Sequence, residues 1–200
     1  MSSPLSKAIV DLSSPDHSVR LAAASEIYSA GRGAAERALA TWWSDAELSA
    51  LVLQPNPVVT VGLAVEREIF RKILAANGTP PLARVPPEQD AEEFELDFPG
   101  GILLDVLTTR EPGGTGAIAR YLAKLGQGIQ QVEYRCLDVN RATILLRERW
   151  GLSPVYPEAR PGAGGTRINF FLVASPHAGN VLIELYQTSA ADPPSSSAPH

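Results

Sequence analysis

Residues 116–187 read GAIARYLAKLGQGIQQVEYRCLDVNRATILLRERWGLSPVYPEARPGAGGTRINFFLVASPHAGNVLIELYQ, and the order of elements in this stretch decides the fold. Its beginning places Ile118, Leu122 and Leu125 on one stripe, which predicts an amphipathic helix. The other predicted elements are a strand at 129–136, a helix at 140–150, a short strand around Val155, a glycine-rich loop at 162–165 and strands at 167–173 and 181–186. The stretch is therefore a linker helix followed by a βαβββ unit.

The preceding residues repeat this order. Residues 58–65 (VVTVGLAV) read as a strand, and residues 66–76 form a helix that Asn77-Gly78 ends. Segments 82–85, 94–98 and 102–108 follow as strands. Because ILLDVL in the first half has the same place as VLIELY in the second, Asp105 corresponds to Glu184. We expect an α+β fold of two βαβββ modules, 58–110 and 128–187, joined by helix 116–125, whose mixed sheet forms a cup.

Four segments resemble the methylmalonyl-CoA epimerase family, a branch of the vicinal oxygen chelate superfamily of glyoxalases, bleomycin resistance proteins and dioxygenases. These segments are the linker helix GAIARYLAKLGQGI, the strand opening QVEYRC, the loop RPGAGG and the closing strand NVLIELYQ. The resemblance covers roughly residues 58–187. It implies that the two modules close around one divalent metal. In the family, each module supplies a His from its first strand and a carboxylate or amide from its last strand.

The resemblance puts Thr60, Asp105, Gln131 and Glu184 at the four metal-ligand positions, so both His positions are substituted. A Thr hydroxyl is a poor ligand and a Gln carbonyl is a weak, neutral one, which disfavours a transition metal. The two carboxylates better suit a hard ion such as Mg²⁺ or Ca²⁺, and no other cofactor is expected. Without a metal, apposed carboxylates repel, so one holds a proton more readily and becomes suited to general acid or base chemistry.

The resemblance also implies a catalytic role for Glu88, in the segment PPEQ, together with Glu184. In the family a Glu removes the α-proton of an acyl-CoA while the metal stabilises the enolate. Glu88 stands close to Glu92 and Glu93 in an acidic run, so an ordinary solvated loop explains its presence equally well.

Candidate ligand contacts are Gln131 and three residues of the loop RPGAGG. Gly164 and Gly165 allow backbone N–H groups to approach a ligand, and Arg160 can pair with a phosphate or carboxylate. The resemblance places this loop near the mouth of the site, where it would suit a CoA thioester. A tight connection between strands accounts for the same glycines.

Residues 1–54 are helical in pattern and lie outside the modules. A helix begins near Ser14 to Asp16, and Gly31 is predicted to end it, with further helices at about 34–43 and 45–53. We expect this extension to pack on the β domain or on a second subunit. The prolines in Gln54–Pro57 mark a linker, which divides the chain into 1–54 and 55–187. Residues 188–200, rich in Ser, Pro and Ala, are predicted to be a disordered tail.

Composition narrows the function classes. The net charge of −5 argues against a nucleic-acid partner, which requires clustered cations. The single cysteine, Cys136, excludes a disulfide framework and fits a reducing compartment. No apolar run reaches the length of a membrane span, and the N-terminus lacks the order of a signal peptide. We therefore expect a cytoplasmic protein without a membrane partner, and a homodimer because members of the family commonly pair.

Two function classes remain open, and a scaffold role in which the helical N-terminus recruits a partner ranks third. The first is a binding protein whose cup holds a small organic acid, an acyl-CoA-like compound or an apolar drug-like ligand without transition-metal chemistry. The second is an epimerase, another isomerase or a lyase that uses carboxylates as acid and base with an atypical metal site. The absent His pair favours the first class, whereas the retained segments PEQ, RPGAGG and IEL keep the second open.

Overall fold

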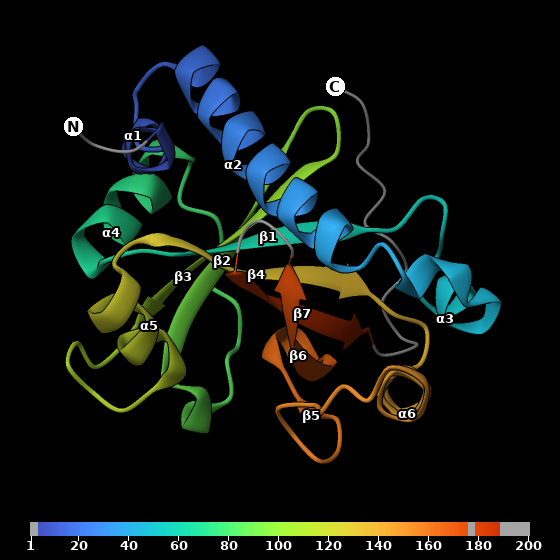
Figure 1. The fold of residues 1–200 in the computed structure, drawn as a ribbon. Coiled ribbons are helices and arrows are strands. Elements are labelled where there is room, and N and C mark those ends of the chain that lie inside the picture. The colour runs from blue at the N-terminus through green and yellow to red at the C-terminus, as the bar shows by residue number, and fades with distance from the viewer. Residues whose placement is uncertain (1–3, 176–178, 189–200) are drawn as a thin grey trace.

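The sheet is built outward from two central antiparallel strands, β1 (Val59–Ala64) and β4 (Gly128–Arg135). The computed structural model describes residues 4–175 and 179–188, and Figure 1 shows their arrangement. Strand β3 (Ile102–Thr109) lies parallel to β1, and β7 (Gly179–Gln187) lies parallel to β4. The outer strands are β2 (Ala91–Phe98), β6 (Arg167–Ser175) and β5 (Arg160–Pro161). The resulting seven-stranded mixed sheet has the order β2-β3-β1-β4-β7-β6-β5.

The strand registers show that the two halves of the sheet are equivalent. Gly62 on β1 pairs with Asp105 on β3, and Glu133 on β4 pairs with Glu184 on β7. These pairings make Asp105 the counterpart of Glu184, as the internal repeat predicts. They also make Gly62 the counterpart of Glu133, so one half carries a carboxylate where the other carries no side chain.

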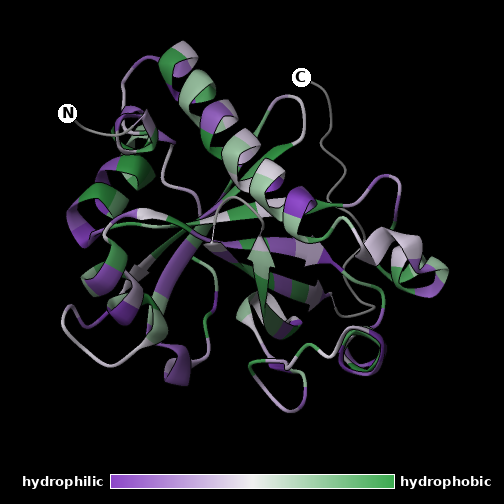
Figure 2. Cartoon of the chain, in the orientation of Figure 1, coloured by the Kyte–Doolittle hydropathy of each residue, from purple (hydrophilic) through white to green (hydrophobic). Residues whose placement is uncertain are grey.

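Helices cover one face of the sheet, and the main core lies between the two layers. The covering helices are α1 (Pro4–Asp11), α2 (His17–Ala38), α3 (Ala46–Leu51), α4 (Arg67–Ala76) and α6 (Val139–Trp150). Alternate residues of β1, namely Val59, Val61 and Leu63, enter this core together with Ile27 of α2. The apolar residues of α2 alternate with polar ones along its length in Figure 2. The α+β fold and the helical extension before the modules are as predicted.

Helix α2 runs unbroken past Gly31, so the prediction that Gly31 ends the helix is wrong. Its start is as predicted, since Asp16 caps the helix by accepting a hydrogen bond of 2.8 Å from the Ser18 N–H. Gly31 is buried where α2 crosses β1, and a Cβ at this position would lie 2.7 Å from Val61 Cγ1. The glycine therefore permits a close crossing of helix and strand instead of terminating the helix.

The second predicted helix of the extension, at about 34–43, is also wrong. Its residues form the end of α2 and a short 3₁₀ turn, η1 (Trp42–Ser44), before α3. Trp42 is fully buried, and its ring meets Phe171 of β6 edge to face at a centroid distance of 6.3 Å. Arg141 and Arg149 of α6 form ion pairs with Glu47 of α3. The extension thus packs on the β domain, which was one of the two alternatives.

The second strand of each module is less regular than predicted. Residues 82–85 form no strand and keep one hydrogen bond to β2, from the Ala83 N–H to the Glu93 carbonyl at 2.9 Å. Near Val155 the structure has an isolated bridge between Pro154 and Phe171, while β5 lies further on at Arg160–Pro161. Both segments adjoin short 3₁₀ turns, η2 (Pro87–Gln89) and η3 (Ala163–Gly165). The irregular parts of the two modules therefore lie next to these two turns.

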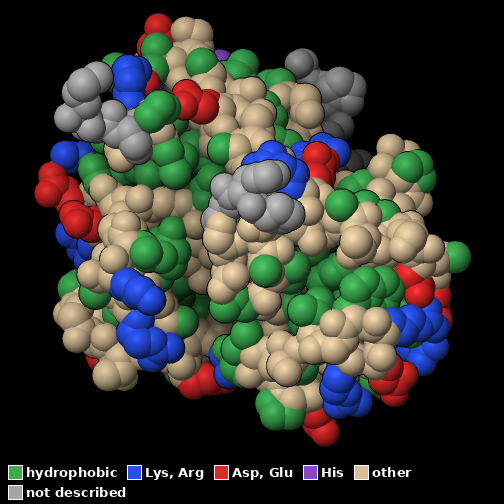
Figure 3. Space-filling model, in the orientation of Figure 1, with side chains coloured by type: hydrophobic (Ala, Val, Ile, Leu, Met, Phe, Trp, Pro, Cys, Tyr) green, Lys and Arg blue, Asp and Glu red, His purple; other side chains and the backbone are tan. Residues whose placement is uncertain are grey.

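The visible surface carries charges of both signs. On the face drawn in Figure 3, acidic and basic side chains lie mostly at the periphery and next to one another. In the part of the chain that the structure describes, no helix combines the length and apolarity needed to cross a bilayer. The predicted tail, apart from Thr188, lies outside the described residues.

Candidate functional site

The face of the sheet opposite the main core encloses a cavity of about 800 Å³. Strands β2, β3, β4, β6 and β7 line it, and η2, the start of helix α5 (Ala117–Leu125) and the loop before β6 form its rim. Alternation of side chains along the strands creates this lining, because successive residues point to opposite faces. On β2, for example, Phe94 and Leu96 enter the core while Glu93 and Glu95 line the cavity.

Five carboxyl side chains from four strands line the cavity. Glu93 and Glu95 come from β2, Asp105 from β3, Glu133 from β4 and Glu184 from β7. Asp105 and Glu184 were predicted from the repeat, whereas Glu93, Glu95 and Glu133 were not assigned to the site. Their signal was nevertheless in the sequence: AEEFELDF and QVEY alternate apolar with polar residues, as half-buried strands do.

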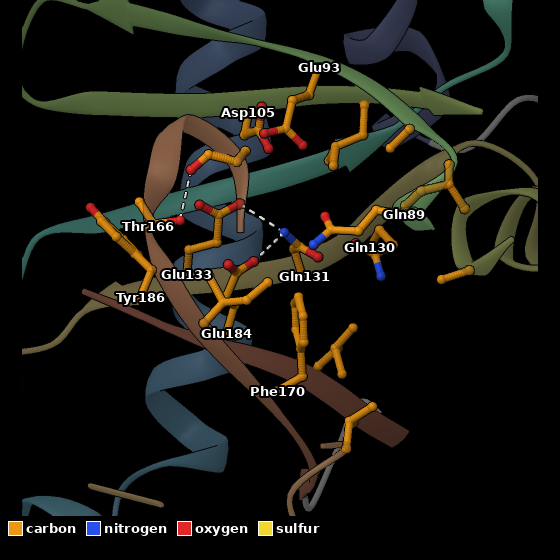
Figure 4. Close-up of a pocket in the computed structure, with 18 of the residues that line it drawn as sticks. Gln89, Glu93, Asp105, Gln130, Gln131, Glu133, Thr166, Phe170, Glu184 and Tyr186 are labelled. Atoms are coloured by element: carbon orange, nitrogen blue, oxygen red, sulfur yellow. Dashed lines mark hydrogen bonds between the residues drawn. The ribbon is translucent and has the colours of Figure 1, made fainter. Parts of the chain in front are cut away.

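Gln131 connects two of these carboxyl groups. Its side-chain Nε2 donates hydrogen bonds to Glu133 Oε1 at 3.0 Å and to Glu184 Oε2 at 2.7 Å, which Figure 4 shows as dashed lines. Gly62 provides the space for this arrangement, because a Cβ there would lie 2.5 Å from Gln131 Cγ. Gln131 therefore places its amide donors, and not its carbonyl oxygen, between the two glutamates.

The environment favours the protonated form of several of these acids. Burial raises the pKa of Glu133 to about 8, with further contributions from Glu93 and Glu95, although the hydrogen bond from Gln131 lowers it. Burial and the charge of Glu95 raise the pKa of Glu93 to about 7. The pKa values of Asp105 and Glu184 are also raised well above the ordinary range, mainly by burial. The cluster can therefore hold protons near neutral pH.

Asp105 differs from the other acids because part of its carboxyl group is buried without a partner. The residue is only 5% exposed, and its Oδ1 atom is buried and accepts no hydrogen bond. Glu93 lies beside it in Figure 4. A buried polar atom without a hydrogen-bond partner is unfavourable. Among the carboxyl groups at the base of the cavity, which we call the floor, Asp105 is therefore the one that most needs a hydrogen-bond donor.

Basic and aromatic side chains line the wall of the cavity near the glycine-rich loop. The Arg160 guanidinium lies over the Tyr156 ring, 3.5 Å from its centroid. Gln89 of η2 donates a hydrogen bond of 3.0 Å to the Pro161 carbonyl, and the Gly164 N–H donates one of 3.2 Å to the Arg84 carbonyl. The segment PPEQ and the glycine-rich loop are thus tied together across the mouth of the cavity.

The structure brings together most, but not all, of the residues that the sequence singled out. Glu88, Asp105, Gln131, Arg160 and Glu184 all line the cavity. Thr60, Gly164 and Gly165 are not among its lining residues. The Gly164 N–H already donates to the Arg84 carbonyl, so at this point the loop is held to the segment before PPEQ.

The possible metal ligands of the cup do not surround a common point. Within residues 4–175 and 179–188, no group of three or more His, Cys, Asp and Glu side chains is placed to hold a metal ion. The carboxyl groups of the cup share a cavity without converging on one point.

Comparisons with known proteins give structural matches only, since no family model and no curated protein matches the sequence. Methylmalonyl-CoA epimerase from Mycobacterium tuberculosis is 30% identical, with a TM-score of 0.53, over 65% of this chain and 86% of that chain. A variant of Streptomyces coelicolor methylmalonyl-CoA epimerase in complex with 2-nitronate-propionyl-CoA is 24% identical, with a TM-score of 0.52, over 68% of this chain and 99% of that chain. A methylmalonyl-CoA epimerase in complex with methylmalonyl-CoA and NH4⁺ is 24% identical, with a TM-score of 0.53, over 69% and 98%. At 24% identity, the last two likenesses concern the fold.

Proposed function

Because the chain belongs to the vicinal oxygen chelate superfamily, we propose that it binds a small organic ligand in its cup without transition-metal chemistry. The orientation of Gln131 carries this proposal. At the position where the resemblance expects a metal-binding His, the Gln131 amide directs N–H donors toward Glu133 and Glu184. An N–H donor cannot ligate a cation, and the Thr60 hydroxyl at the other His position is a poor ligand. The residues present therefore do not fit the superfamily's transition metal.

The ligand class suggested by the resemblance is a small organic acid or an acyl-CoA-like compound. A cavity of about 800 Å³ has room for such a molecule. Arg120 and Arg160 line its wall and could hold a carboxylate or phosphate there. The proposal is thus a binding site with basic groups on the wall and acidic groups on the floor.

An epimerase-like enzyme is the second candidate, and one observation favours it. Glu88 and Glu184 line the same cavity, although they come from separate elements. Burial raises the pKa of Glu184, so this carboxyl can hold a proton for transfer to a substrate. Such a reaction would have to stabilise an enolate without the usual metal, which removes a large electrostatic contribution.

Elemental analysis and an exchange assay distinguish the two candidates. We would measure transition-metal content in protein purified without an affinity tag, and exchange of the α-proton of methylmalonyl-CoA with deuterium from the solvent. We expect neither stoichiometric metal nor exchange. Stoichiometric metal with exchange that is lost in Glu184→Gln but retained in Glu148→Gln would overturn the proposal. Glu148 is a suitable control because it is exposed on α6 and does not line the cavity.

We also propose a homodimer, on the basis of the resemblance alone. Light scattering during size-exclusion chromatography measures the molar mass directly. A mass of one chain across the accessible concentration range would exclude the dimer.

A further inference from the structure

The floor of the cup gathers five carboxyl groups, and the basic residues Arg120, Arg135 and Arg160 that line the same cavity form no ion pair with them among the described residues. Glu93, Glu95, Asp105, Glu133 and Glu184 all line it. The ion pairs found among the described residues involve none of these five side chains. Carboxylates that face one another in a partly buried cavity raise one another's energy unless they bind protons or a cation.

Asp105 provides a second, independent indication that a ligand belongs there. Its Oδ1 atom is buried and has no hydrogen-bond partner, although the side chain faces the cavity. Gln131 cannot supply the missing donor, because its amide nitrogen already donates to Glu133 and Glu184. A donor for Asp105 would therefore have to come from a bound molecule or a proton.

The surroundings suit an organic cation better than a metal ion. The described part of the chain offers no group of three or more ligand side chains arranged around one point. A cavity of about 800 Å³ is also of the size that holds a drug-sized organic molecule. Phe170 and Tyr186 line it next to Glu184, as Figure 4 shows, and aromatic faces attract organic cations. The Arg160 guanidinium over the Tyr156 ring is a cation–π contact of the same kind on the wall of the cavity.

We propose that the floor of the cup recognises a protonated amine, so that the ligand is a small organic molecule with an ammonium group next to an apolar body. The ammonium group donates to Asp105 and lies among Glu93 and Glu184, and the apolar body contacts Phe170 and Tyr186. This inference rests on the proposed function, that the cup binds a small molecule. It adds that the part of the ligand that reaches the floor carries a positive charge.

Three probes of nearly equal shape test the charge: benzylammonium, benzyl alcohol and benzoate. Their binding to the full chain is measured by ligand-observed NMR titration at low ionic strength. We expect benzylammonium to bind at least about tenfold more tightly than benzyl alcohol, as a close and partly buried charge pair allows. Asp105→Asn should remove most of this preference, and Glu93→Gln should weaken it. Glu148→Gln, which changes the net charge equally outside the cavity, should leave it within about twofold.

The outcomes separate this inference from the proposed function. If benzyl alcohol or benzoate binds at least as tightly as benzylammonium, the charge assignment is wrong while a ligand-binding cup remains. If the amine preference persists in both Asp105→Asn and Glu93→Gln, the floor is not its site and the inference fails. Displacement of benzylammonium by stoichiometric Mg²⁺ or Ca²⁺ would show a metal site and overturn it. If none of the probes and no CoA thioester binds, the proposed function fails as well.

Discussion

Glu93 shows how the electrostatics of the cup act on a single residue. Glu95 stands on the same strand, while Asp105, Glu133 and Glu184 face it from β3, β4 and β7, and Arg110 is the cation that counteracts them. Burial and the charge of Glu95 raise its pKa from an ordinary 4.5 to about 7. A carboxyl with a raised folded-state pKa stabilises the fold fully below its unfolded pKa. This contribution is lost as the pH rises through 7.

We predict that Glu93→Gln stabilises the protein more at pH 8 than at pH 5. The gain should differ by roughly 1–2 kcal/mol between the two pH values, allowing for the partial exposure of the side chain. At pH 5 the wild-type carboxyl is largely protonated in the folded state and resembles Gln; at pH 8 it must carry a charge. Urea unfolding at both pH values measures the difference. An equal effect at the two pH values, or a larger gain at pH 5, would contradict it.

The lining of the cavity was predictable from sequence where the repeat or the family resemblance marked a position. Asp105 and Glu184 could be matched because ILLDVL and VLIELY are similar segments. Glu133 has Gly62 as its counterpart, so the comparison of the halves gave no reason to single it out. Gln131 was assigned as a weak ligand through its carbonyl, because the sequence does not show which side of an amide faces its neighbours.

Among the elements, α2 departs most from what its sequence predicts. Within the modules, the helices and the long strands follow from periodicity, which local sequence determines, whereas the second strand of each module does not. The continuation of α2 past Gly31 depends instead on a tertiary contact, since the helix crosses β1 at Val61. Glycine disfavours a helix interior in isolation, but tertiary packing can override this preference. The sequence alone could not reveal that a strand lies under the glycine.

We predict that Gly31→Ala destabilises the protein by about 1–3 kcal/mol, the usual cost of overpacking a filled core. The added Cβ would lie 2.7 Å from Val61 Cγ1 and 2.9 Å from Val61 Cγ2. Gly33→Ala is the matched control in the same helix, because its Cβ would meet only the end of the Arg37 side chain at 3.3 Å. Gly33→Ala should be neutral or stabilising by up to about 1 kcal/mol. Thermal unfolding of both variants measures the change in stability. Equal effects of the two substitutions would contradict the close packing of α2 on β1 at Gly31.

At the scale of the whole molecule, the extension and the cup lie on opposite faces of one sheet. Apolar residues of the extension, such as Ile27 and Trp42, belong to the same core as Val61 and Phe171 of the strands. The division between 1–54 and 55–187 remains a prediction about domains, while the packing joins both parts in one hydrophobic cluster. Each buried side chain of this size contributes about 1.5–3 kcal/mol, so their loss together is comparable with the stability of a typical domain.

We predict that a chain beginning at Pro55 no longer unfolds cooperatively and associates through its uncovered sheet face. Circular dichroism during thermal unfolding and size-exclusion chromatography compare it with the full chain. The reason is that Val59, Val61 and Leu63 would then face water without α2. A monodisperse product with a sharp unfolding transition would instead establish residues 55–187 as an autonomous domain.

Helix α2 touches β1, β3, β4, β6 and β7, and therefore bridges both modules from behind the sheet. A brace in this position resists hinge motion, because the halves of the cup could not swing apart without breaking its contacts. Adaptation to different ligands then falls to the rim, where the PPEQ turn and the glycine-rich loop are joined by only a few hydrogen bonds. The protein pairs a stiff back wall with an adjustable mouth, so ligand selectivity can change through rim residues while the shape of the floor is kept.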